Sequence, residues 1–167
     1  MARADDTELI DAFEEFYRSY YRNEIGELAA LVKILFFHTA VDCQFKHGQA
    51  LLERAIYLYE KYQHTMGENQ QAHAANIIVL GLTFFSAELE RTEPFAELGL
   101  KIAQKLWLKG LEAETRLARC YRNLFAGNLM SCRQEIEDSL PFIKDPQVSL
   151  INRCALHLAQ LNLLANE

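Results

Sequence analysis

The sequence predicts an all-α protein made of antiparallel helical hairpins, with about seven to eight helices. Glycine and proline, which interrupt helices, are scarce at seven and three residues out of 167. The alternating β-branched runs that are typical of strands are missing. Half of the residues are hydrophobic and 24% are charged, which favours a packed core over disorder. We divide the chain into an N-terminal segment, 1–27, and a helical-repeat domain, 28–167.

Turn-forming residues set the expected helix boundaries. Gly67, Gly110 and the Gly127-Asn128 pair are typical of helix C-terminal ends, whereas Thr92-Glu93-Pro94 and Asp145-Pro146 are typical of helix starts. After a first helix within residues 7–27, the expected helices are 28–45, 48–65, 69–90, 94–109, 111–126, 129–140 and 146–165. Because the connections are only a few residues long, successive helices should be antiparallel neighbours.

Two residue patterns recur on alternate helices. A large–small–large pattern is repeated at intervals of 37 residues, as Leu80-Gly81-Phe84, Leu117-Ala118-Tyr121 and Cys154-Ala155-Leu158. A small–large–small pattern marks the helices between them, as Gly48-Leu52-Ala55, Ala96-Leu100-Ala103 and Cys132-Ile136-Ser139. We expect Gly81 to permit close helix approach, although glycine costs roughly 1 kcal/mol in an isolated helix. A tolerated glycine or a kink is the alternative.

These patterns resemble those of the tetratricopeptide-repeat family over about residues 28–167. In that family the first helix of each hairpin carries the large–small–large pattern, the second carries the small–large–small pattern, and a proline falls near the end of the unit. The repeat here is longer than the usual 34 residues and lacks the first-helix tryptophan. The resemblance implies a short α-solenoid that acts as a non-enzymatic scaffold and binds a protein or peptide in a concave groove. A generic α-solenoid or an irregular bundle is the alternative.

The N-terminal segment TELIDAFEEFYRSYYRNEIGELA, residues 7–29, carries an aromatic stripe at helical spacing. It resembles the opening helix of archaeal minichromosome-maintenance helicases. This implies an alternative function, a regulatory or replication-associated subunit whose N-terminal helix docks a partner. The ATPase of that family needs a G-x-x-x-x-G-K-[ST] phosphate loop, which this sequence does not contain. We therefore expect the segment to cap the repeat domain or to dock a partner.

The candidate peptide-binding residues are basic and amide side chains on two first-type helices. They are Arg116, Arg119, Arg122, Asn123, Asn152 and Arg153. In the resembled family such residues often hold an acidic peptide or a free C-terminal carboxylate, because guanidinium groups bind carboxylates bidentately. Replacing the three arginines should then weaken binding and leave thermal stability nearly unchanged. The alternative is that they pair with Glu112, Glu114 or acids of the next hairpin.

The rest of the expected groove is apolar. Related positions on the earlier hairpins are occupied by Ile34, Phe37, Val41, Ile78, Leu82 and Phe85. The groove is therefore expected to pass from apolar to basic, which suits an amphipathic helix or a hydrophobic, acidic peptide. The N-terminal aromatic helix is an alternative occupant of the apolar half.

Composition and motifs also indicate which classes of partner to exclude. The net charge of −6 disfavours nucleic acid or an anionic membrane and favours protein partners. Apolar runs fall short of the roughly 18 residues of a membrane span. The sequence contains none of the standard hydrolase, zinc-protease or dinucleotide motifs, so we expect no enzyme activity, cofactor or metal.

The four cysteines lie far apart without a C-x-x-C pair, and no secretory leader is evident, so we expect a reducing cytoplasm. Cys43 and His47 would supply two ligands from one helix face, whereas structural zinc usually takes four. Cys120 and Cys132 are nearly equidistant from the Gly127 turn. We expect them to face each other across the hairpin as thiols.

The C-terminal helix, CALHLAQLNLLANE, is of the first type and has no second-type helix after it. Its leucines, Leu156, Leu158, Leu161 and Leu164, cannot all be covered by one neighbouring helix. We expect either that this end self-associates or that the chain is a piece of a longer protein.

Overall fold

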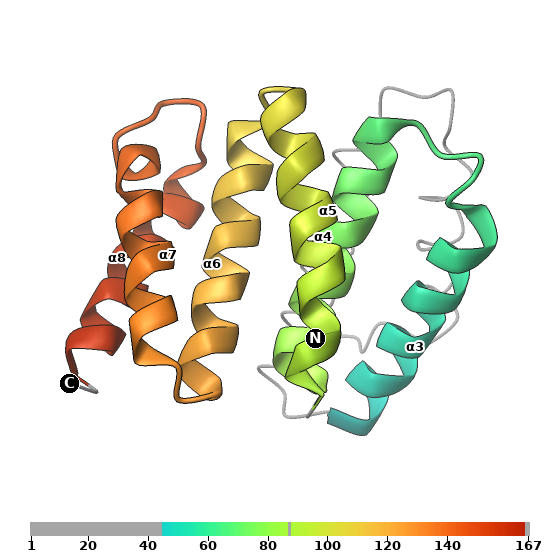
Figure 1. Ribbon diagram of the computed structural model, residues 1–167, viewed down its shortest axis with the longest axis horizontal. Helices are drawn as coiled ribbons and strands as arrows, with labels where there is room; N and C mark the ends of the chain where they lie inside the picture. Colours follow the sequence, from blue (N-terminus) through green and yellow to red (C-terminus); the bar gives the residue numbers. More distant parts are fainter. Residues whose placement is uncertain (1–44, 87, 166–167) are drawn as a thin grey trace, which may run out of the picture.

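The computed structural model describes residues 45–86 and 88–165, and these residues are folded into helices connected by short turns (Figure 1). In chain order the elements are α3 Phe45–Tyr62, α4 Glu68–Phe85, the 3-10 helix η1 Leu89–Arg91, α5 Thr92–Lys105, α6 Lys109–Phe125, α7 Leu129–Ile143 and α8 Leu150–Ala165. The predicted all-α class is confirmed for this part of the chain, which contains no strand. The helices expected within residues 1–44 lie outside the described residues. Among the described helices, none combines the length and apolar character that crossing a membrane requires.

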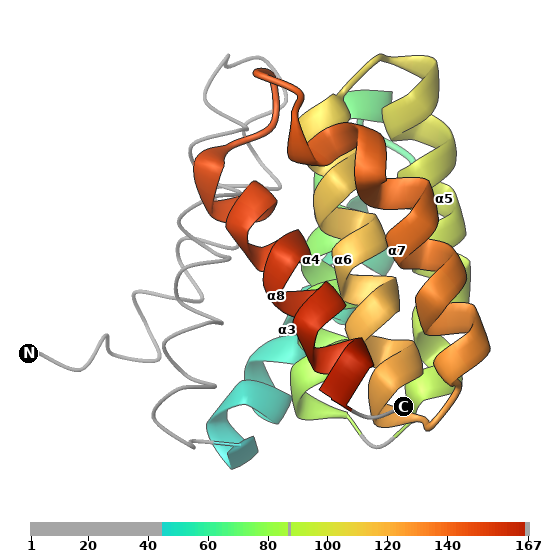
Figure 2. The ribbon, with the colours of Figure 1, turned by 90° about the vertical axis from the view of Figure 1, so that its left-hand side faces the viewer.

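The helices pack as two layers. α4, α6 and α8 follow one another in the first layer, where α6 contacts both α4 and α8. In the second layer α5 packs against α4 and α6, and α7 packs against α6 and α8. Figure 2 shows α5 and α7 on the opposite side of α6 from α8. Side chains of α6 therefore reach both the hairpin before it and the helices after it.

The predicted end of α4 and the predicted start of α8 are wrong, each for a local reason. α4 ends at Phe85 instead of residue 90, because Ser86 has an extended backbone and its Oγ accepts a hydrogen bond from the Glu88 N–H at 2.9 Å. α8 begins at Leu150 instead of residue 146. Asp145 forms a turn there, with its Oδ1 accepting the Gln147 N–H at 2.9 Å.

The prediction that Gly110 ends the helix before α6 is also wrong. Gly110 lies in the first turn of α6, and the helix stop is formed by Trp107, whose φ of 57° is left-handed. The Leu108 N–H donates to the Ala103 carbonyl at 2.8 Å. Gly127, with φ 74°, forms the equivalent turn after α6. In both turns a residue with left-handed backbone geometry follows the helix, a position at which glycine is usually preferred.

Replacing Trp107 by glycine should raise the free energy of unfolding by about 1 kcal/mol. The left-handed conformation costs a non-glycine residue roughly that much, and the Trp107 side chain is 79% exposed, so little packing is lost. Urea unfolding followed by circular dichroism tests this, because Trp107 is the sole tryptophan and its loss removes the fluorescence signal. Trp107→Ala keeps the Cβ atom and is the control. The explanation fails if the alanine variant is stabilised as much as the glycine variant.

The largest apolar core lies between α3 and α4 and includes Leu52, Leu58 and Ile77. Ile78, Leu82 and Phe85, which we expected in the apolar half of a groove, are buried in this core. Because these side chains fill the contact between α4 and α3, they do not line an open surface. Ile34, Phe37 and Val41 lie outside the described residues.

Gly48 on α3 leaves room for the Phe85 ring of α4. A Cβ atom built there would lie 2.3 Å from Phe85 Cδ1 and 2.7 Å from Phe85 Cγ, closer than van der Waals contact allows. Gly81 is also buried, in the middle of α4. Gly48, the first residue of a small–large–small pattern, therefore provides space for this ring, and the close approach expected at Gly81 stays a prediction.

Candidate functional site

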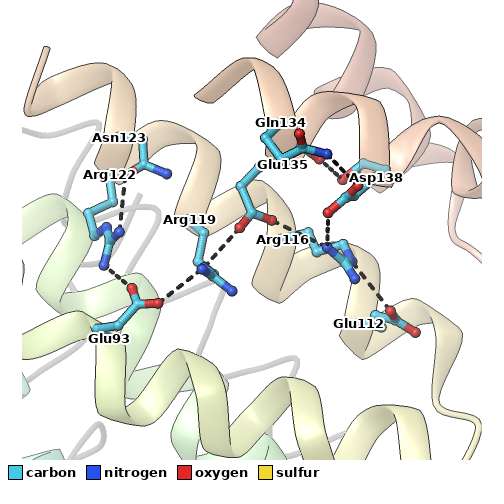
Figure 3. Close-up of polar contacts among 10 residues, drawn as sticks. Glu93, Glu112, Arg116, Arg119, Arg122, Asn123, Gln134, Glu135 and Asp138 are labelled. Atoms are coloured by element: carbon cyan, nitrogen blue, oxygen red, sulfur yellow. Dashed lines mark hydrogen bonds and ion pairs between the residues drawn. The ribbon is translucent and has the colours of Figure 1, made fainter. Parts of the chain in front are cut away.

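A cluster of charged side chains joins α6 to α5 and α7 (Figure 3). On α6, Glu112, Arg116, Arg119 and Asn123 are three or four positions apart, so they share one face of the helix. A different face carries Leu117, Tyr121 and Leu124, which pack into an apolar cluster. The amphipathic pattern of α6 thereby directs the predicted arginines toward the second layer.

Arg116 contacts three carboxylates at the α7 side of the cluster. Its Nε lies 3.3 Å from Glu112, and its Nη1 lies 3.4 Å from Glu135 and 3.3 Å from Asp138. Charge-assisted hydrogen bonds between guanidinium and carboxylate are typically about 2.7–2.9 Å. All three contacts are longer than this, so Arg116 shares its charge among several acids without forming a tight bidentate pair.

Arg119 and Arg122 connect the cluster to α5. The Arg119 Nη2 atom lies 2.9 Å from Glu93, at the start of α5, and its Nε lies 3.0 Å from Glu135 on α7. Arg122 also pairs with Glu93, and its Nη2 donates to the Asn123 side-chain oxygen at 3.0 Å. Glu93 and Glu135 therefore each bridge two arginines, and Arg119 links three helices.

Glu135 is the most buried acid of this cluster. Its side chain is 9% exposed, compared with 43% for Asp138. Burial raises the pKa of Glu135, and the nearby positive charges of Arg119 and Arg116 act in the opposite direction. Removing either arginine would leave the buried carboxylate less well compensated.

Beside this cluster, a furrow of about 550 Å³ runs between α5 and α7. We call it the α5–α7 furrow; it is lined by Glu97, Leu100, Lys101, Gln104, Arg116, Arg119, Gln134, Glu135 and Asp138. Among the ionised side chains of this lining, three are cationic and three anionic. The furrow therefore offers polar, charge-balanced contacts together with one leucine.

The structure separates the six predicted site residues into two groups. Arg116, Arg119, Arg122 and Asn123 lie together in the charged cluster. Asn152 instead donates to Glu114 at 3.0 Å, and Glu114 is two positions from Arg116, which places it on a different face of α6. Arg153 lies next to Asn152 on α8, and its Nε is buried without a hydrogen-bond partner.

Sequence reasoning anticipated the pairing of Arg116 with Glu112 but missed Glu93 as an arginine partner. Glu112 is four residues from Arg116 and is found from helical spacing alone. Glu93 is 29 residues from Arg122, so only the packing of α5 on α6 brings them together. Its position beside Pro94 in the first turn of α5 indicated a helix start and gave no indication of its partner.

The thiols of Cys120 and Cys132 face each other across the α6–α7 hairpin, as their spacing predicts. Their sulfur atoms are 3.2 Å apart, and both residues are buried and free. Burial is the main cause of the strongly raised pKa of Cys120, and the contact with Cys132 adds to it. The Cys120 thiol therefore stays protonated near neutral pH and is a poor nucleophile.

Metal binding finds no further support in the part of the chain that the structure describes. There, no three histidine, cysteine or acidic side chains are grouped so that they could hold a metal ion. Cys43 lies outside the described residues, so its expected pairing with His47 stays a prediction.

Comparisons of this chain with protein-family models, curated proteins and solved structures found no match.

Proposed function

We propose that the protein is a non-enzymatic scaffold of tetratricopeptide-like hairpins that binds an acidic peptide or protein segment in the α5–α7 furrow. The observation that carries the proposal is the coordination of Arg116 by three acids at 3.3–3.4 Å. A guanidinium held this loosely can form a shorter contact with an incoming carboxylate. The binding surface is thus the second-layer side of α6, and not the apolar face of α4.

Repeated contacts between successive first-layer helices support stacked hairpins. Asn76 on α4 donates to Thr115 on α6 at 3.0 Å, and Asn152 on α8 donates to Glu114 on α6 at 3.0 Å. Thr115 and Asn152 are 37 residues apart, the interval at which the sequence patterns recur. The same interval therefore relates residues in equivalent positions of consecutive hairpins, as expected of a helical repeat.

The exchange of carboxylates would take place at Asp138. Its side chain is 43% exposed, so water can solvate it once a ligand carboxylate has replaced it beside Arg116. Glu135 is too buried to be released in this way. Lys101, an exposed residue of the furrow lining on α5, supplies a second positive charge for an acidic ligand.

We would test the proposal with an array of short, fluorescein-labelled peptides rich in Asp and Glu, with and without a free C-terminal carboxylate, using fluorescence anisotropy. Arg116→Gln should weaken the best binder at least about tenfold, a change of about 1.4 kcal/mol. Asp138→Asn should tighten binding, because it removes the competing carboxylate. Binding should also weaken between about 0.05 M and about 0.3 M NaCl.

The matched control is Arg91→Gln. Arg91 also pairs with two acids, Glu53 and Glu88, but lies on η1 and does not line the furrow. This variant should bind the peptides as the wild type does. The proposal fails if no acidic peptide binds at about 100 µM, or if Asp138→Asn weakens binding as much as Arg116→Gln does.

A further inference from the structure

The outer face of α8 is apolar and exposed. Leu150, Leu158, Leu161 and Leu164 are between 53% and 67% exposed, and Cys154 and His157 are exposed among them. At 100° per residue these six side chains form one stripe along the helix, which we call the α8 outer face. Arg153 and His157 are the sole basic side chains of α8, and the helix contains no acidic one. A surface helix with so few charges indicates a contact surface.

The internal repeat shows what kind of element this face can bind. Moving 37 residues along the chain converts Leu117, Tyr121 and Leu124 of α6 into Cys154, Leu158 and Leu161 of α8. On α6 these residues pack in a cluster with Cys132 and Ile136 of α7 and with Ala159 and Leu163 of α8, so both helices cover them. The α8 outer face is therefore an uncovered equivalent of an α6 face on which two helices already pack.

A groove of about 470 Å³ adjoins the α8 outer face, between α7 and α8. Its lining is Arg133, Ile136, Glu137, Leu140, His157, Gln160, Leu161, Leu163 and Leu164. Arg133 and Glu137 are one helical turn apart on α7, so the border of this apolar groove carries one positive and one negative charge. A strongly acidic or strongly basic partner would gain little from it.

We infer that the occupant of this face is a second copy of the chain, with α8 packed antiparallel on α8 of the other copy about a two-fold axis. The arrangement is self-complementary in charge. With the axis near Leu158 and Leu161, Arg153 of each copy lies near the carboxyl end of the other α8, which is the negative end of the helix dipole. The opposite charges of Arg133 and Glu137 likewise allow complementary contacts across a two-fold axis.

This interface is separate from the α5–α7 furrow, since the two surfaces share no lining residue. The proposed peptide binding and the proposed dimer can therefore fail independently. A dimer through α8 would present two furrows per particle, and a partner with two acidic segments could engage both.

Size-exclusion chromatography with light scattering on the full chain tests the inference. The wild type should have twice the 19.2 kDa mass of one chain at about 100 µM. Leu161→Glu should be monomeric, because it brings two carboxylates together in an apolar contact. Met130→Glu is the matched control: Met130 is 79% exposed on α7 and lies outside the groove lining, so this variant should remain dimeric. Circular dichroism should show unchanged helicity in both variants.

The reactivity of Cys154 provides a second readout. In a Cys43→Ser background, with Cys120 and Cys132 buried, an aromatic disulfide reagent should label Cys154 slowly in the dimer. Labelling should be at least about tenfold faster in Leu161→Glu. A monomeric wild type overturns the inference. If Cys154 then reacts rapidly, the α8 outer face is open and available to a different protein. If Cys154 is protected in the monomer, another segment of the same chain covers the face.

Discussion

Gly48→Ala is expected to lower the free energy of unfolding by about 2 kcal/mol, although alanine is normally the better helix residue. The new methyl group would lie 2.3–2.7 Å from the Phe85 ring, and Phe85 is itself buried between α3 and α4. The ring therefore cannot move aside without disturbing the largest core cluster. Urea unfolding at a fixed pH measures the loss.

Gly99→Ala is the matched control for this substitution. Gly99 is another buried helical glycine, in α5, but a Cβ atom there would lie 3.7 Å from Ala75 and 3.8 Å from Thr115. These are ordinary contact distances, so Gly99→Ala should stabilise the protein by up to about 1 kcal/mol. The double variant Gly48→Ala with Phe85→Leu should be less destabilised than the sum of the two single variants. Additive losses would show that the ring is not the cause.

Arg119→Ala is expected to destabilise the protein by about 2 kcal/mol at about pH 7, because it removes one of the two cations that compensate buried Glu135. Arg91→Ala is the control and should cost less than about 1 kcal/mol, since its carboxylate partners are well exposed. Equal losses in the two variants would contradict a special role for the buried acid.

The loss caused by Arg119→Ala should depend on pH. Burial raises the pKa of Glu135 in the folded protein above its value of 4.5 in an unfolded chain, and Arg119 opposes that rise. An acid with a raised folded pKa contributes stability below its unfolded pKa, and this contribution is lost as the pH rises through the folded pKa. Without Arg119 the folded pKa should rise further. The difference in the free energy of unfolding between wild type and variant should therefore be smallest at about pH 4 and grow toward about pH 7. Urea unfolding across that pH range measures it.

This expectation differs from the one that the sequence alone suggested. If the three arginines form a peptide-binding groove, replacing them should leave thermal stability nearly unchanged; the alternative from the sequence is that they pair with nearby acids. In the structure Arg119 has two acidic partners from different helices, Glu93 and Glu135. The arginines are thus part of the packing between α5, α6 and α7, and a binding assay must use variants, such as Asp138→Asn, that separate the two roles.

Local patterns predicted the helices well, because periodicity and turn residues act over a few neighbours. They failed to predict the helix end at Trp107, because this residue adopts an uncommon left-handed backbone conformation although Gly110 is only three residues away. They also failed at Ser86, whose side chain helps to end α4. Residue spacing located Arg116, Arg119 and Arg122. Only the three-dimensional packing could show that carboxylates from α5 and α7 occupy the same face of α6.

The position of Arg119 between Glu93 and Glu135 has a consequence for how the molecule opens. In a linear stack of helical hairpins, each pair can in principle separate from the next as an independent unit. Here one guanidinium holds carboxylates from the helices on either side of α6, so parting α5 from α6, or α6 from α7, breaks an ion pair to the same side chain. We therefore expect α5, α6 and α7 to resist local opening as a unit of three helices, which differs from the two-helix hairpin that the sequence pattern suggests.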